Sequence, residues 1–179
     1  MNAAHLHLML NHLPVIGIPL GLIMLLLALR KGSSDLRRFS YVFLVAIALI
    51  SIPAFLSGEG AEEVVEHLPG VSEALIESHE EVAEIAWALT LISGALSLLL
   101  EISERLSRWV PLRGRVLTLL VLCLVGASGT LLYTGNLGGQ IRHTEIRSDA
   151  LSAAGVPGGG EAGGEGLENR SQSGESEGD

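Results

Sequence analysis

The chain has 179 residues and a formal net charge of −9, yet 48% of its residues are hydrophobic and its mean hydropathy is +0.46. This balance excludes an ordinary soluble acidic protein and a basic nucleic-acid-binding protein, and it favours a membrane protein. The single cysteine, Cys123, lies in an apolar run and excludes both a disulfide framework and a zinc site built on cysteines.

Four apolar stretches follow one another along the chain. They are residues 9–29, 39–56, 82–100 and 116–133. Each has close to the roughly 20 residues that a helix needs to cross a hydrocarbon core of ~30 Å. None alternates with a period of two, and a membrane span must satisfy its own backbone hydrogen bonds. The sequence therefore predicts an all-α membrane protein, a bundle of four transmembrane helices.

Charged residues are distributed unequally between the three connections. Connections 30–38 and 101–115 each hold four basic residues, whereas connection 57–81 holds eight glutamates and no lysine or arginine. Basic loops stay on the cytoplasmic side of a membrane. We therefore expect both termini and the 57–81 connection on the outer side, an N-out/C-out topology.

The last part of the chain changes composition abruptly. From residue 148 onward it consists mainly of Gly, Ser and Glu, which cannot bury enough apolar surface to offset the entropy of ordering. The sequence predicts a transmembrane domain over residues 1–147 and a disordered acidic tail over residues 148–179.

All six histidines lie on the predicted outer side. They are His5, His7, His12, His67, His79 and His143. Bundle cores build cofactor sites from facing helices, so the hypothesis from the residues is a b-type haem with His12 and His79 as axial ligands. His5 or His143 are alternates for His12, while His7 points away from the face that His5 and His12 share.

His79 belongs to a predicted long helix over residues 71–100. Ile76, His79 and Ala86 fall on its apolar stripe, whereas four glutamates between residues 77 and 84 form a polar one. The imidazole should therefore point into the bundle and needs a polar partner there. A metal would supply one, and the alternative is a hydrogen bond to a serine, a carbonyl or Glu84.

Two further features of the sequence have simpler interpretations. The stretch Glu62, Glu63, Glu66 and His67 predicts a short acidic helix with a solvated face rather than a cation site. The Gly17 and Gly21 pair has GxxxG spacing, which predicts close packing of the first helix against a neighbour.

The motifs also carry a family resemblance. The stretch His7-Leu-Met-Leu-Asn-His12-Leu-Pro14, with its Asn-His-x-Pro motif, and segments 58–81 and 138–147 resemble uncharacterised bacterial four-helix inner-membrane proteins. The likeness covers about residues 1–147 and extends to membrane domains that open with His-x-x-x-His-x-Pro and are suspected of binding haem. Here the two histidines are one residue further apart. The resemblance implies a multi-pass protein of the bacterial inner membrane, with its outer side in the periplasm.

These observations predict a b-type-cytochrome-like, haem-binding electron-transfer subunit rather than an enzyme, with the quinone pool or a membrane redox complex as partner and no nucleic acid. One alternative is a non-catalytic accessory subunit whose acidic outer connection binds a partner. Another is a periplasm-facing Zn or Cu protein that uses His5, His7 and His67.

Overall fold

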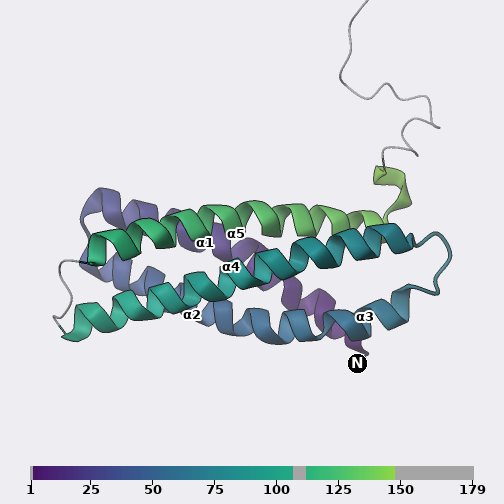
Figure 1. The fold of residues 1–179 in the computed structure, drawn as a ribbon, viewed down its shortest axis with the longest axis horizontal. Helices are drawn as coiled ribbons and strands as arrows, with labels where there is room; N and C mark the ends of the chain where they lie inside the picture. The colour runs from purple at the N-terminus through teal and green to yellow at the C-terminus, as the bar shows by residue number, and fades with distance from the viewer. Residues whose placement is uncertain (1, 107–111, 148–179) are drawn as a thin grey trace, which may run out of the picture. The chain divides into compact units, whose positions relative to one another are not determined.

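The structure is a computed structural model that describes residues 2–106 and 112–147. Its helices, in chain order, are α1 (Ala3–Lys31), α2 (Ser34–Leu56), α3 (Gly58–Val65), α4 (Glu73–Leu106) and α5 (Arg113–Arg142), followed by the 3-10 turn η1 (Thr144–Ile146) (Figure 1). The described residues up to Thr144 form one compact unit, and the bundle described below belongs to it. The predicted disordered tail lies outside the described residues.

Within the described residues, α1, α2, α4 and α5 are each long and apolar enough to cross a membrane. Each contains one of the four predicted apolar stretches, so the helical class and the four apolar helices are confirmed and fit a multi-pass membrane protein. The helices α4 and α5 extend beyond their apolar stretches, because α4 begins at Glu73 and α5 continues to Arg142. The short acidic helix is also confirmed as α3, which ends before His67.

A tight turn joins α1 to α2. Gly32 has a φ of 63°, in the left-handed region that glycine adopts without strain, and the Ser33 N–H donates to the Ala28 carbonyl at 3.1 Å. The Ser33 hydroxyl then caps α2 by accepting from the Leu36 N–H at 3.3 Å. With only two residues between the helices, α1 and α2 form an antiparallel pair.

The packing order places α1 and α4 on a diagonal. Both α1 and α4 pack against α2 and α5, and α3 packs mainly against α1. Glycines permit the closest approaches: a Cβ at Gly17 would lie 2.6 Å from the Ile47 Cδ1, and one at Gly94 would lie 2.4 Å from the Ala48 Cβ. Gly17 and Gly21 therefore serve helix packing, as their spacing predicts.

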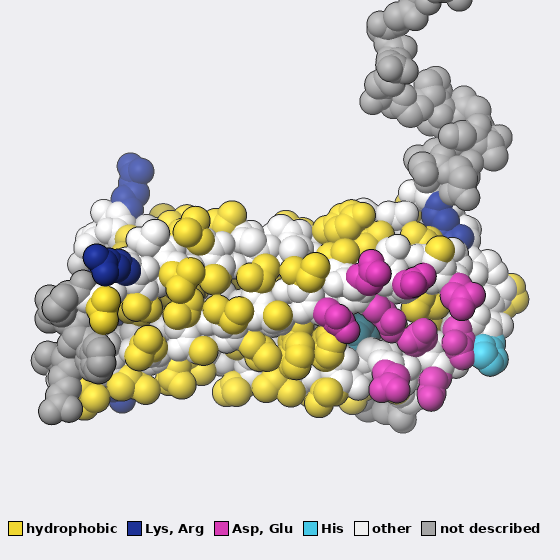
Figure 2. Space-filling view, in the orientation of Figure 1, with side chains coloured by type: hydrophobic (Ala, Val, Ile, Leu, Met, Phe, Trp, Pro, Cys, Tyr) yellow, Lys and Arg dark blue, Asp and Glu magenta, His cyan; other side chains and the backbone are white. Residues whose placement is uncertain are grey.

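The bundle is apolar on its surface as well as in its core. The core consists mainly of aliphatic side chains such as Ile18, Leu25, Leu44 and Leu124, with small hydroxyl side chains among them, namely Ser40, Ser51, Thr90, Ser93, Ser97 and Thr134. Large apolar side chains are also exposed on every long helix, and Figure 2 shows the hydrophobic surface of one face; Leu49 and Leu122 have exposed fractions of 62% and 64%. A soluble bundle would carry mainly polar side chains on its surface, whereas a bundle surrounded by lipid needs apolar side chains there.

Acidic side chains gather over α3 and the first turns of α4 (Figure 2). This is the end of the bundle away from the turn between α1 and α2, where Arg30, Lys31, Arg37 and Arg38 lie. We call these two regions the acidic end and the basic end.

Candidate functional site

His7 lies near the start of α1, where the Asn2 side chain caps the helix by accepting from the His5 N–H at 3.0 Å. The His7 side chain is half-buried, and its Nδ1 lies 2.9 Å from the Ala54 carbonyl oxygen on α2. The Ser57 hydroxyl donates to the same carbonyl at 2.9 Å. Because a carbonyl only accepts, the Nδ1 carries the proton in this arrangement and donates it.

His79 makes the same kind of contact on the other side of the bundle. Its Nδ1 lies 3.0 Å from the Thr134 carbonyl oxygen on α5. The ring lies against Gly138, where a Cβ would come within 3.2 Å of the His79 Cε1. A bond to a carbonyl was one of the partners that the sequence left open for this imidazole.

The two histidines share a local arrangement. Each ring donates its Nδ1–H to a backbone carbonyl and also lies close to the glycine four residues after that carbonyl. For His7 the carbonyl belongs to Ala54 and the glycine is Gly58. For His79 the carbonyl belongs to Thr134 and the glycine is Gly138. No hydrogen bond joins either Nε2 to a residue in the described part of the chain. Both Nε2 atoms therefore keep a lone pair that a ligand can use.

The two imidazoles lie at the same end of the bundle, and His7 is the smallest of the three influences on the charge of His79, after burial and the Thr134 carbonyl. His7 extends from α1 and contacts α2, whereas His79 extends from the diagonally placed α4 and contacts α5. We call His7 and His79 the histidine pair.

The other histidines are exposed. The His12 Nδ1 lies 2.7 Å from the Leu8 carbonyl of its own helix, so the structure does not turn His12 inward as the predicted partner of His79 would require. His5 and His143 are on the surface, and His67 lies 3.3 Å from the Glu66 carboxylate. Within residues 2–106 and 112–147, no three His, Cys, Asp or Glu side chains form a group that could hold a metal ion, so His5, His7 and His67 do not come together as one.

The spacing of small residues and Pro14 along α1 indicates that His7 faces inward. The buried stripe of α1 includes Pro14, Gly21 and Ala28, which are seven residues apart. His7 continues this spacing towards the N-terminus. Extending the stripe backwards would have placed His7, and not His12, on the inward face.

At the basic end, two carboxylates of α4 hold together arginines from three helices. The Glu101 Oε1 lies 3.3 Å from Arg38 and 2.7 Å from Arg105. The Glu104 Oε1 lies 2.7 Å from Arg37 and also pairs with Arg113. From the sequence alone, these arginines indicate only the orientation of the chain in the membrane. The pairing explains how charges are tolerated at the end of the apolar helices.

Comparison with protein-family models, with curated proteins and with solved structures gave no match for this chain. The resemblance to bacterial four-helix inner-membrane proteins therefore stays a prediction.

Proposed function

We propose that this chain is a multi-pass protein of a bacterial inner membrane that binds one b-type haem between His7 and His79 and transfers electrons on the periplasmic side. The observation that carries the proposal is the histidine pair, two half-buried imidazoles whose Nδ1 atoms are fixed by carbonyls and whose Nε2 atoms have no hydrogen-bond partner among the described residues.

This arrangement fits the chemistry of an axial ligand. A ligating histidine nearly always donates its other ring N–H to a carbonyl or carboxylate, which fixes the tautomer and makes the free nitrogen more basic. A six-coordinate haem needs two such ligands from the protein, whereas zinc is usually held by three or four. A pair of imidazoles on different helices therefore supports haem better than it supports Zn or Cu.

The residues around the pair have defined roles in this proposal. The Ala54 and Thr134 carbonyls orient the two rings, and the close contact with Gly138 sets the position of His79. Haem would supply one-electron transfer when bound, and the burial of the two rings would influence its potential. The partner would be a quinone or a redox complex in the same membrane.

An optical spectrum of the purified protein in detergent tests the proposal. We expect a Soret band and an α band that sharpens on reduction, and we expect His7→Ala and His79→Ala each to lose most of the haem. His12→Ala is the matched control, because His12 is exposed on the same helix as His7. Haem that survives both His7→Ala and His79→Ala, or that is lost only in His12→Ala, would contradict the ligand assignment.

The acidic end supports a second candidate, an accessory subunit that docks a basic partner on the outer side. Its carboxylates are crowded, since hydrogen bonding to Glu80 raises the pKa of Glu62 above its usual value. Protein that is colourless after expression with ample haem, and that retains a basic partner at low salt but not at high salt, would favour this function. Colourless protein with stoichiometric zinc or copper would instead favour the metal-handling alternative.

A further inference from the structure

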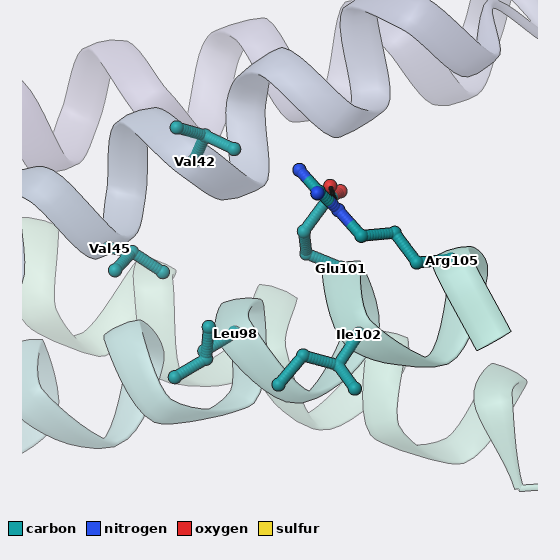
Figure 3. A pocket seen from close by; sticks show the side chains of 6 residues that line it. All are labelled: Val42, Val45, Leu98, Glu101, Ile102 and Arg105. Carbon is teal, nitrogen blue, oxygen red and sulfur yellow. Dashed lines mark hydrogen bonds and ion pairs between the residues drawn. The ribbon is translucent and has the colours of Figure 1, made fainter.

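A groove between α2 and α4 lies at the basic end, away from the histidine pair. Its volume is about 320 Å³ and its lining is almost entirely apolar, with Val42 and Val45 from α2 and Leu98 and Ile102 from α4 (Figure 3). Two charged residues, Glu101 and Arg105, complete the lining. The groove thus combines an aliphatic surface with one ion pair.

The Glu101 carboxylate is only half satisfied. Its side chain is 7% exposed, and both ion pairs, with Arg38 and Arg105, use the same oxygen, Oε1. The other oxygen, Oε2, is buried and has no hydrogen-bond partner among the described residues. A buried, unpartnered carboxylate oxygen is costly, so this atom calls for a donor from outside the described chain.

The two arginines that pair with Glu101 are exposed and have N–H donors to spare. The Arg38 and Arg105 side chains are 45% and 62% exposed, and each uses one N–H for Glu101. A guanidinium has five N–H donors, and its geometry matches phosphate. The group of two cations and one anion therefore keeps a net positive charge together with one unpaired carboxylate oxygen.

Position in the helix adds a further constraint. Glu101 follows Leu100, the last residue of the apolar stretch 82–100, and Arg105 lies one turn further along α4, at the level where lipid headgroups meet the hydrocarbon. The aliphatic part of the groove extends from there towards the middle of the helices. A ligand that fits has a polar head with both charges and an aliphatic chain below it.

We propose that this groove binds a phospholipid with a primary-amine headgroup, such as phosphatidylethanolamine. Its ammonium donates to the Glu101 Oε2, its phosphate accepts from Arg105 and Arg38, and an acyl chain lies along the four aliphatic side chains. A choline headgroup has no N–H to donate, and a glycerol headgroup has no positive charge, so both satisfy the site less well.

Native mass spectrometry of the intact protein, with an equimolar mixture of ethanolamine, choline and glycerol phospholipids of identical acyl chains, tests the proposal. For the first lipid retained, we expect ethanolamine lipid to exceed choline lipid by about fivefold, within the range that the net gain of one hydrogen bond gives. In Glu101→Gln the ratio should fall to about one, because the neutral amide no longer attracts the ammonium.

Glu104→Gln is the matched control. Glu104 lies on the same helix, is 8% exposed and also pairs with two arginines, but it does not line the groove. The ethanolamine preference should survive this change. Leu98→Trp, at a 46% exposed position that should tolerate a larger side chain, fills the groove without touching the ion pairs and should lower the ratio to about one even if Glu101→Gln fails to fold. A ratio near one in the native chain, or a preference that persists in Leu98→Trp, would overturn the proposal.

Discussion

Replacing Gly94 by alanine should destabilise the bundle, although alanine is the better helix former. The added Cβ would lie 2.4 Å from the Ala48 Cβ, whereas ordinary contacts lie at 3.4–4 Å. The two atoms must therefore separate by about 1 Å, and because the obstacle is a Cβ and not the end of a flexible side chain, α2 and α4 have to move apart. Such overpacking costs about 1–3 kcal/mol.

The net effect follows from two opposing contributions. The steric cost is at the upper end of that range, about 3 kcal/mol. Helix propensity returns up to about 1 kcal/mol. Gly94→Ala should therefore lower the free energy of unfolding by about 2 kcal/mol. The assay is unfolding in mixed micelles with increasing dodecyl sulfate, followed by circular dichroism. Gly129→Ala is the matched control, because a Cβ at Gly129 meets nothing within 4 Å. It should leave stability unchanged or raise it by up to about 1 kcal/mol.

A reciprocal exchange isolates the steric cause. The Cβ at position 94 lies 3.9 Å from the Ala48 Cα, an ordinary contact, so adding Ala48→Gly to Gly94→Ala should restore near-native stability. If Gly94→Ala is as stable as the native chain, or if the double variant is weaker than the single one, the contact between α2 and α4 is not what the structure indicates.

Two further predictions concern Glu62, at the acidic end, and Trp87, which stacks on Phe55. Hydrogen bonding to Glu80, with smaller contributions from desolvation and like charge, raises the pKa of Glu62 above its ordinary value. The folded chain therefore keeps the Glu62 proton to a higher pH than the unfolded chain does. The free energy of unfolding should fall as the pH rises above about 4.5. Glu62→Gln should remove that part of the pH dependence, and parallel pH curves for the two proteins would contradict it. Trp87 stacks on Phe55 with ring centroids 4.2 Å apart, and its buried Nε1 has no partner in the described residues. Trp87→Phe keeps the stacking and removes the unpaired N–H, so it should stay within about 1 kcal/mol of native in the micelle assay, whereas Trp87→Ala should lose about 3 kcal/mol; equal losses in both would refute a packing role.

The fold could be predicted from the sequence because hydropathy and charge act over whole segments. An apolar run of about 20 residues predicts a helix whatever its neighbours are. The acidic stripe of α4 was also predictable, since Glu77, Glu80, Glu81 and Glu84 are all exposed while Ile76 and Ala86 are buried. The orientation across the membrane stays a prediction.

The site was less predictable because it depends on which helices touch. The choice between His7 and His12 rests on the rotation of α1 against α2, which the Ala54 carbonyl reveals and the histidine spacing does not. The pairing of Glu101 with Arg38 likewise joins residues far apart in the sequence. The seven-residue spacing along α1 indicates that His7 faces inward, but the partner of each contact depends on tertiary packing and leaves no regular spacing in the sequence.

The length of α4 determines which surface of the membrane can exchange electrons with the proposed cofactor. Its 34 residues correspond to about 51 Å, against a hydrocarbon thickness of ~30 Å. His79 precedes Glu101 by about 33 Å along the axis at 1.5 Å per residue, so when Glu101 meets one headgroup layer, His79 reaches the other. A redox partner would have to approach the surface that His79 reaches, as a soluble protein or as a lipid-soluble carrier within the adjacent leaflet.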